Sequence, residues 1–516
     1  MFESANSIRT PWKKSPMTPY DTAARPDSFA ASRESFDALV AELGGESVAA
    51  QPHDRLEEFV DARGRELLRR LLQDHLDLRA AREARADQVT GADGRVRRAV
   101  EQGHTRQLAT LFGKVTVTRM AYRASGAANL YPLDAALNLP RGLHSHGLRR
   151  AAVLEAVRGS FDAARAAIVS RCGKVAGKRQ LEQLVRAAAR DIEAFYHARI
   201  PAPCTRDVLV VISVDGKGIV MRPEALREAT RKAAARKKSL FRTRLASGEK
   251  PNRKRMATLA TVYDASPAPR RPHDVITVPG GRFGTRPVRP GPHAKAKWLT
   301  GSVEKDPAEV VAAAFAQAEA RDPGHRRTWV VLVDGAVHQL DLIQQEAARR
   351  KAEIHIVVDL VHVLERLWAA ARCFHTADDP AAEDWVAVHA LQVLAGHAHE
   401  TADAIEQQAD RGRLTEDQRQ AAEAAVRYLR GKAEFLRYDT ALAAGWPIAT
   451  GVIEGACRHL IGDRFDLAGA RWGLAGAEAL LNLRALIDNG DFEIYWRFHV
   501  QREHERVHQS RYQLTA

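Results

Sequence analysis

The sequence predicts an α/β core that is interrupted by an all-helical insertion and preceded by a mainly helical N-terminal region. Two observations lead to this fold class. Residues 208–214 and 329–333 are apolar, β-branched runs bounded by turn residues, which is typical of central buried strands, and a further strand is expected at 354–358. From residue 375 to about residue 438 the chain is instead rich in Ala, Glu and Gln at helical spacing, without a strand pattern.

Length and composition narrow the class of protein. The chain has 516 residues, too many for one ordinary core, and about three domains are expected. Its 78 Lys and Arg residues exceed its 64 Asp and Glu residues, which gives a formal net charge of +14. A basic excess of this size favours nucleic acid as a partner, because Lys and Arg release counterions from phosphates. The four scattered cysteines argue against a disulfide framework and a structural zinc site.

Neither a membrane protein nor a secreted one is indicated. No apolar run approaches the roughly 20 residues that span a bilayer. Residues 1–33 lack the apolar centre of a signal peptide. We therefore expect a cytoplasmic, nucleoid-associated protein with no membrane partner.

The N-terminal part is expected to consist of a tail and a mainly helical region. Residues 1–52 are rich in Ser, Pro and charge and are expected to be poorly ordered, apart from a short helix near residues 36–43. Residues 53–199 form the second region. Helical spacing covers about residues 54–85, and alternation about Gly113-Lys114 predicts a β-hairpin over residues 106–124.

A helix–turn–helix pattern follows the hairpin. Ser160 is suited to cap one helix, Gly173 lies in a turn, and Lys178 and Arg179 begin the next helix. A recognition helix that enters DNA has this appearance. Two ordinary packed helices give the same pattern, and the local excess of Lys and Arg leaves the two interpretations equally weighted. Residues 53–199 are therefore expected to be a DNA-binding region.

The core is expected in two pieces, residues 200–372 and 446–490, with the helical insertion over residues 373–445 between them. A C-terminal tail helix is expected over residues 491–516. Three meandering strands followed by alternating helices and strands is the layout of a ribonuclease-H-like core. The expected elements, in order, are strands at 208–214, 256–263 and 273–278, a helix at 307–320, a strand at 329–333, a helix at 339–350 and a strand at 354–358.

Three apolar runs end on a carboxylate: residues 208–214 on Asp215, residues 329–333 on Asp334 and residues 447–453 on Glu454. Ligands of open α/β sheets bind outside the carboxyl ends of strands, and the first and fourth strands of this layout are adjacent. We therefore expect Asp215 and Asp334 side by side, with Glu454 approaching from a helix that begins near Val452. For either aspartate alone, an ordinary Asp-Gly turn is the better interpretation.

Such a carboxylate set suits divalent metal ions. Mg²⁺ takes hard oxygen ligands and keeps several waters, so a few carboxylates are enough. Two such ions about 4 Å apart activate the attacking oxygen and stabilise the leaving oxygen in phosphoryl transfer. We expect Mg²⁺, with Mn²⁺ as a substitute.

A second pair accompanies the first set. Asp359 ends a strand, and His362 lies one turn into the following helix, so the two side chains can face the same site. Asp359 could replace Asp334 as a metal ligand. The alternative is that Asp359 is only the helix cap and His362 its neighbour.

Basic residues surround these carboxylates in the sequence. Arg458, Arg464 and Arg471 suit bidentate phosphate binding, and Trp472 either stacks on a base or packs in the core. A long basic run follows the first strand and is expected to track a DNA backbone, although a solvated helix face explains part of it. This run contains Arg227, Arg231, Lys232, Arg236, Lys237, Lys238, Arg242, Arg244, Lys250, Arg253, Lys254 and Arg255.

With these motifs the chain resembles bacterial insertion-sequence transposases with a DDE catalytic triad, in the Mutator-related group and its ISKra-type branch. The resemblance spans about residues 107–489. It is carried by Ser213-Val214-Asp215-Gly216-Lys217-Gly218, Val333-Asp334-Gly335, Asp359-Leu360-Val361-His362 and Thr450-Gly451-Val452-Ile453-Glu454-Gly455-Ala456-Cys457-Arg458, with Arg158-Gly159-Ser160-Phe161-Asp162 and Arg471-Trp472 also similar.

The resemblance implies a function and assigns roles. Asp215, Asp334 and Glu454 would be the metal-binding triad, and Asp359 and His362 would fill the Cys-or-Asp-x-x-His motif of the group. The implied activity is DNA cleavage and strand transfer at the inverted repeats of a transposable element. Its partners would be double-stranded transposon ends and target DNA, bound by a homodimer or larger assembly, with no small-molecule substrate.

Two other functions fit the same residues. One is a metal-dependent DNA nuclease that cuts without joining strands. The other is a DNA-binding regulator that keeps the fold without catalysis, although the presence of all three carboxylates argues against it.

Overall fold

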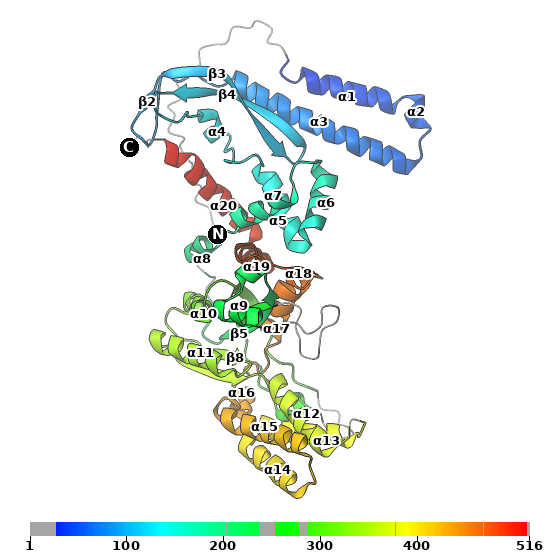
Figure 1. Cartoon of the computed structure of the whole chain (residues 1–516), viewed down its shortest axis with the longest axis vertical. Helices are drawn as coiled ribbons and strands as arrows, with labels where there is room; N and C mark the ends of the chain where they lie inside the picture. Colours follow the sequence, from blue (N-terminus) through cyan, green and yellow to red (C-terminus); the bar gives the residue numbers. More distant parts are fainter. Residues whose placement is uncertain are drawn as a thin grey trace. The chain divides into compact units, whose positions relative to one another are not determined.

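The computed structural model shows a mixed α/β protein that divides into two compact units (Figure 1). One unit contains residues 1–191 and 493–516, and the other contains residues 192–492. The structure describes residues 27–199, 201, 204–236, 253–277, 287–376, 378–467 and 469–512. Among these residues, no helix is both long enough and apolar enough to cross a membrane.

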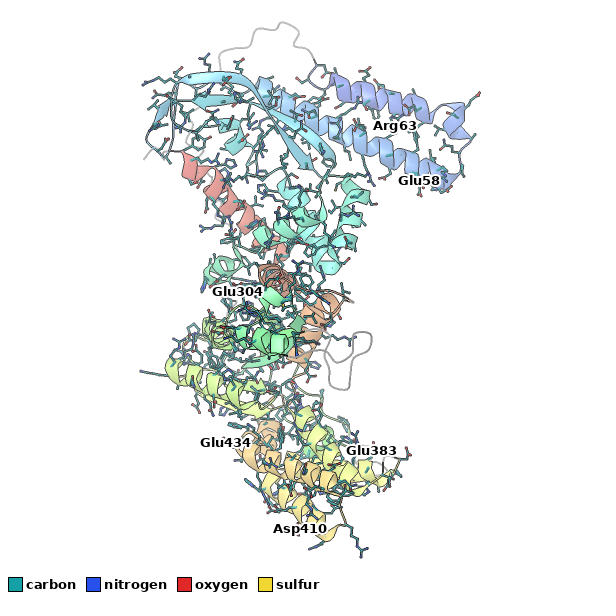
Figure 2. The ribbon with its side chains drawn as sticks, in the orientation of Figure 1. Glu58, Arg63, Glu304, Glu383, Asp410 and Glu434 are labelled. Atoms are coloured by element: carbon teal, nitrogen blue, oxygen red, sulfur yellow. The ribbon has the colours of Figure 1, made fainter. Side chains whose placement is uncertain are left out.

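The first unit begins with helices where a tail was expected. These are α1 (Ala30–Leu43), α2 (Glu46–Ala49) and α3 (His53–Ala81). The short helix expected near residues 36–43 is confirmed as part of the longer α1, and the expectation of poor order is wrong for residues 30–35 and 46–49. Helix α1 lies along α3 (Figure 1), and polar contacts join them. The Ser32 backbone N–H donates to the Asp74 carboxylate at 3.0 Å, and Arg63, labelled in Figure 2, pairs with Glu42 at 2.7 Å. Residues 1–26 lie outside the described part of the chain.

The predicted hairpin is confirmed, with a longer first strand. Strands β3 (Ala99–Thr110) and β4 (Gly113–Arg123) pair antiparallel and turn at residues 111–112. Gly113 has a φ of +119°, a conformation that favours glycine. Helix α3 packs against β4, and the contact buries Leu76 with Val115 and Val117. Strands β1 (Val89–Thr90) and β2 (Val96–Arg97) and helix α4 (Pro132–Ala136) accompany the hairpin.

Four longer helices complete this unit: α5 (His146–Arg158), α6 (Phe161–Cys172), α7 (Lys178–Ala188) and α20 (Phe492–Val507). The predicted serine cap is confirmed, because the Ser160 hydroxyl accepts the Ala163 N–H at 3.0 Å. The expected C-terminal helix is α20, followed by a short 3₁₀ turn, η5 (Gln509–Arg511). It joins the N-terminal residues through His499, whose ring nitrogen lies 2.7 Å from the Asp191 carboxylate.

The second unit is built on one five-stranded sheet. Its strands are β5 (Leu209–Val220), β6 (Lys254–Ala265), β7 (Ala294–Ser302), β8 (Trp329–Val333) and β9 (Ile354–Val358). They lie in the order β7-β6-β5-β8-β9. The pairs among β7, β6 and β5 are antiparallel, and the pairs among β5, β8 and β9 are parallel. Strands β8 and β9 have the predicted bounds.

Two strand predictions are wrong. The third strand is β7, because Pro272 lacks an N–H and the segment Pro272–Asp274 forms a 3₁₀ turn (η2) instead; Val278 lies outside the described residues. The first strand does not end at Asp215-Gly216. It continues to Val220, which pairs with Lys254 of β6, so Asp215 lies inside a long antiparallel ladder.

Helices surround this sheet and continue its core. The first are α8 (Ile192–Ala198), η1 (Pro223–Ala225), α9 (Glu228–Arg236), α10 (Pro307–Arg321), α11 (Val337–Arg350) and α12 (Leu360–Phe374). The expected insertion is helical in its described residues, with α13 (Ala381–Leu394), α14 (Ala398–Arg411), α15 (Glu416–Lys432), η3 (Ala433–Phe435) and α16 (Tyr438–Ala443). One apolar core extends from the sheet into these helices. Glu383 and Asp410, labelled in Figure 2, lie on α13 and α14.

The chain then returns to the sheet through short elements. These are α17 (Gly451–Ala456), the π-helical turn η4 (Cys457–Gly462), α18 (Asp463–Phe465) and α19 (Leu474–Asp488). Helix α17 and η4 contact β5, and α19 packs against β7. A π-helical turn widens a helix locally and occurs often at functional sites. Here it directly follows Glu454.

Candidate metal centre and basic surface

Three aspartates share one level of the parallel part of the sheet. Ser213 of β5 pairs with Leu332 of β8, and Val333 of β8 pairs with Val358 of β9. When these registers are continued to the strand ends, Asp215, Asp334 and Asp359 fall in one row. Neighbouring strands lie about 4.8 Å apart, so adjacent members of the row are neighbours. The row occurs where β8 and β9 end, although β5 itself continues.

Glu454 is tied to both ends of this row. Cys457, one helical turn beyond it, directs its thiol to an Asp215 carboxylate oxygen at 3.1 Å. Burial, followed by the negative charge of Asp215, raises the pKa of the Cys457 thiol, so the thiol stays protonated and acts as the donor. At the other end, the hydroxyl of Thr450 lies between Glu454, at 3.1 Å, and Asp359. Glu454 therefore lies between the first and third aspartates.

Thr450 links two carboxylates of this region. Its hydroxyl has one proton to donate, yet it has two carboxylate neighbours, Asp359 and Glu454. Asp359 is fully buried, and its other oxygen accepts the Val361 N–H at 2.9 Å, which caps α12. A buried carboxylate beside a second carboxylate is costly unless cations or hydrogen bonds compensate for it. The arrangement suits a bound cation.

His362 completes a candidate metal-binding cluster. One ligand atom each of Asp359, His362 and Glu454 lies within 4.8 Å of the others, and this is the one such trio in the described part of the chain. Burial by itself lowers the pKa of His362. The hydrogen bond to Glu365, at 3.0 Å, and the charges of Asp359 and Asp334 outweigh burial and raise that pKa above its ordinary value.

Asp334 is the least constrained carboxylate of the row. It is half-buried, and one of its oxygens accepts the Ala336 N–H at 2.8 Å, within its own turn. No described group donates to the other oxygen. Gly335, with a φ of +87°, turns the chain sharply after it. A metal ion could therefore bind Asp334 without breaking a protein contact, whereas both oxygens of Asp359 already have protein donors.

The helical insertion contributes a tyrosine to this edge. A Cβ built on Gly335 would lie 3.6 Å from the Tyr428 hydroxyl of α15, so the hydroxyl is close to the turn after Asp334. That hydroxyl is buried and has no hydrogen-bond partner among the described residues. Burial raises the pKa of Tyr428 to about 12 against the effect of Arg366, whose guanidinium lies 5.3 Å from the ring centre. The tyrosine is therefore neutral and able to donate.

The arginines and the tryptophan near Glu454 fall into two groups. Arg458 and Arg471 are exposed and remain available to a phosphate backbone. Arg464 is 2% exposed and lies over the Trp472 ring at 4.9 Å. Trp472 is buried, and its indole N–H donates to the Phe465 carbonyl at 3.2 Å. Because Arg464 and Trp472 are buried, neither is placed to contact DNA. Of the two interpretations of Trp472, packing in the core agrees with the structure.

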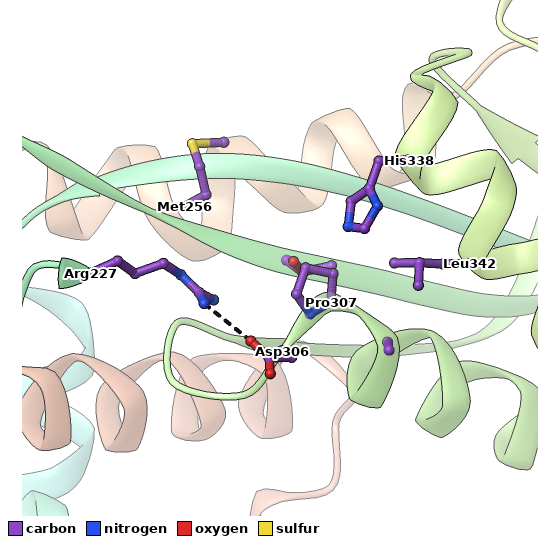
Figure 3. A pocket seen from close by; sticks show the side chains of 8 residues that line it. Arg227, Met256, Asp306, Pro307, His338 and Leu342 are labelled. Atoms are coloured by element: carbon purple, nitrogen blue, oxygen red, sulfur yellow. Dashed lines mark hydrogen bonds and ion pairs between the residues drawn. The ribbon is translucent and has the colours of Figure 1, made fainter. Parts of the chain in front are cut away.

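The basic run after the first strand is only partly a free surface. Arg227 pairs with Asp306 at 3.1 Å, beside a cavity of about 420 Å³ that is also lined by Met256 and His338 (Figure 3). Arg255 donates to three backbone carbonyls, including that of Val303 at 2.6 Å, so it serves the fold. Lys254 is exposed and Arg253 half-buried. Lys237 and Lys238 lie outside the described residues.

In the other unit, the two basic residues at the start of α7 are both exposed. Lys178 pairs with Asp162 of α6 at 2.6 Å, which ties the two helices of the predicted helix–turn–helix together. Arg179 forms no ion pair within the described chain. Of the two, Arg179 is the better placed to contact DNA.

Several residues of the acidic edge were missed in the sequence. Thr450 and Cys457 each hydrogen-bond a carboxylate that is far away in the chain, and Tyr428 comes from the insertion. Gln339 of α11 donates to the Val214 carbonyl at 2.8 Å, next to Asp215. Thr450 and Cys457 lie four and three residues from Glu454. At this spacing, side chains share one face of a helix, and this was the one sequence signal that they lie beside the glutamate.

Comparison with known proteins gives no assignment for this geometry. No family model matches the chain, and no curated protein matches it. The carboxylates and their neighbours are therefore the basis for a functional assignment.

Proposed function

We propose that this chain is a DNA transposase with a ribonuclease-H-like core. In this proposal it binds the terminal inverted repeats of an insertion sequence and cleaves and joins DNA in a metal-dependent reaction. The single observation that carries the proposal is the row of Asp215, Asp334 and Asp359 across adjacent strands, with Glu454 tied to it. The strand order and the helical insertion before Glu454 support the same fold.

The donor set fits Mg²⁺ or Mn²⁺. Asp215, Asp334 and Glu454 offer carboxylate oxygens, the ligands that these hard ions take. When bound, two such ions would activate the attacking oxygen and stabilise the leaving oxygen of a phosphodiester. We assign the second ligand to Asp334 and not to Asp359, because Asp359 is fully buried and caps α12, whereas Asp334 is half-buried and accepts only a local hydrogen bond.

The surrounding residues hold the ligands in place. Asp359 and Thr450 fix Glu454 from one side, and the Cys457 thiol fixes Asp215 from the other. Such outer partners orient metal ligands and tune their affinity. The exposed Arg458 and Arg471 would bind DNA phosphates next to the site.

Metal binding tests the site separately from activity. Mn²⁺ should raise the melting temperature of the full-length wild-type protein, because an ion that binds only the folded state stabilises it. Asp215→Asn should abolish this effect. Asp341→Asn is the matched control, since it removes an exposed carboxylate of α11 in the same unit. An equal Mn²⁺ response in Asp215→Asn and wild type would refute the site.

The reaction itself is tested with DNA that carries the sequences flanking the coding region. Transposition predicts both cleaved and joined products with Mg²⁺, and their loss in Asp215→Asn. Cleaved products without joined ones would instead identify a nuclease. Binding without cleavage would identify a regulator.

A further inference from the structure

A second site lies in the N-terminal unit, far in sequence from the carboxylates. It is a groove of about 640 Å³ between the β-hairpin and the helix–turn–helix. The hairpin contributes Gln107 and Lys114, α6 contributes Arg165, and the turn contributes Lys174 and Gly177. Gln180 of α7 completes the polar lining. The hairpin and the helix–turn–helix, both parts of the expected DNA-binding region, thus form one surface.

The groove is electropositive and its cations are available. Lys114, Arg165 and Lys174 are all exposed and come from three different elements. No carboxylate lines the groove. None of the three cations forms an ion pair with any residue that the structure describes. This distinguishes them from Lys178, which Asp162 neutralises.

Backbone hydrogen bonds hold the walls together. The segment between hairpin and helices joins the edge of β3, with the Ala109 N–H donating to the Leu143 carbonyl at 2.7 Å and the Ser145 N–H donating to the Ala109 carbonyl at 2.9 Å. The buried His144 lines the groove together with Val175 of the turn. These hydrogen bonds hold the segments that carry the cations in fixed positions. Less conformational entropy is therefore lost when the groove binds a partner.

The end of α7 adds to the attraction for anions. Gly177, the N-cap residue, lines the groove, and its N–H is satisfied by the Gln180 side chain at 2.8 Å. The helix N-terminus carries partial positive charge and unpaired N–H groups, which suit phosphate. The three side-chain cations and the helix end therefore point to one class of ligand, a polyanion.

We propose that this groove binds the sugar-phosphate backbone of duplex DNA. Single-stranded nucleic acid is usually held by bases stacked on aromatic rings, and no Phe, Tyr or Trp lines the groove. Backbone contacts by Lys, Arg, amide side chains and a helix N-terminus position a duplex without reading its sequence. The proposal depends on the proposed function only for naming transposon ends as the natural duplex.

The test is the salt dependence of binding by the full-length protein to a 30-base-pair duplex of mixed sequence, followed by fluorescence anisotropy. Lys114→Gln, Arg165→Gln and Lys174→Gln should each weaken binding and lower the slope of log K against log salt by about 1, as expected for one lost phosphate contact. The matched control is Arg82→Gln. It removes an exposed arginine at the end of α3 that neither lines the groove nor has an ion-pair partner in the described chain.

Three outcomes would overturn the proposal: unchanged slopes in the groove variants, an equal loss in Arg82→Gln, or tighter binding of single-stranded DNA or RNA of the same length. All three side chains are exposed, so each variant should have the melting temperature of the wild type. Thermal unfolding of each variant checks this and thereby excludes misfolding as the cause of lost binding. The Mn²⁺ response of the groove variants should match wild type. The salt slope of the groove variants tests the groove and the Mn²⁺ response tests the metal site, so failure of the groove and failure of the metal site are separate results.

Discussion

The two units of this protein are stabilised by different physics. The α/β unit has one extensive apolar core that runs from the sheet through the insertion helices. The N-terminal unit has separate apolar clusters around Val117 and Tyr122 and further buried apolar side chains on α5, α6 and α7, and it also contains buried polar contacts such as Ser32 with Asp74 and His499 with Asp191. The unit with the large core can carry a cluster of carboxylates at its edge. The other unit depends on groups whose charge changes with pH.

The largest expected effect concerns the second metal ligand. Asp334→Asn should abolish the Mn²⁺ stabilisation of the α/β unit and reduce DNA cleavage at least ~1,000-fold, equivalent to about 4 kcal/mol in the barrier. Without metal its stability should stay near wild type, because Asp334 accepts only a local hydrogen bond. Hydrogen exchange of peptides from each unit measures the stabilisation, and cleavage assays measure the barrier.

Asp359→Asn provides the contrast. It should lower the metal-free stability by about 1 kcal/mol through the α12 cap while retaining measurable Mn²⁺ binding. If Asp359→Asn loses the Mn²⁺ response and Asp334→Asn keeps it, the two roles must be exchanged.

Acid should destabilise the N-terminal unit before the α/β unit. In the N-terminal unit, burial lowers the pKa of His144, His146, His499 and His508, the last to about 4. A folded-state pKa below the unfolded value of about 6.5 contributes stability that is present above pH 6.5 and lost as pH falls toward 4. For His508 the full effect is on the order of 3 kcal/mol. Exchange in this unit should therefore accelerate first between pH 6.5 and 4.

The matched variant is His508→Gln, which keeps an N–H donor for the Leu139 carbonyl but does not titrate. It should reduce the pH dependence of the N-terminal unit and leave that of the α/β unit unchanged. Simultaneous acid unfolding of both units, or no change in the variant, would contradict this account.

Much of the α/β unit could be predicted from the sequence. Strand β8 is apolar on both faces, β9 is mostly β-branched, and α10 begins with Asp306 and Pro307, so local pattern determines their bounds. Strand β7 was missed because it is an edge strand whose first half is polar and exposed. The extension of β5 past Asp215 was missed because its residues include Gly216 and Gly218, and pairing with β6 overrides their low strand propensity.

Within the candidate site, the carboxylates could be predicted from the sequence, but the residues that contact them could not. The carboxylates are visible because each directly follows a recognisable apolar run. The contacts of Cys457 with Asp215 and of Thr450 with Asp359 join residues separated by 242 and 91 positions, and only the tertiary fold brings them together. Burial of Arg464 against Trp472 likewise depends on packing that no local pattern specifies.

A smaller effect is expected from Thr450, which supports Glu454 without being a ligand in the proposal. Thr450→Val keeps the shape and removes the hydroxyl shared by Glu454 and Asp359. Loss of such an outer partner typically weakens metal affinity ~10–100-fold. Mn²⁺ titration monitored by melting temperature measures the shift. Thr401→Val is the control, because that buried hydroxyl donates to the His397 carbonyl of its own helix. Equal Mn²⁺ affinities in the two variants would remove Thr450 from the site.

The smallest expected effect distinguishes a functional tyrosine from a structural one within the insertion. The Tyr428 hydroxyl is buried without a partner in the described chain, whereas the Tyr438 hydroxyl donates to the Val358 carbonyl at 2.7 Å. Tyr428→Phe should therefore leave the metal-free stability unchanged or raise it by up to about 1 kcal/mol, and Tyr438→Phe should lower it by a similar amount. If Tyr428 donates to a DNA oxygen beside Asp334, Tyr428→Phe should also slow cleavage while Mn²⁺ binding is unchanged. A destabilised Tyr428→Phe protein with normal cleavage would show that the hydroxyl serves only the packing of α15.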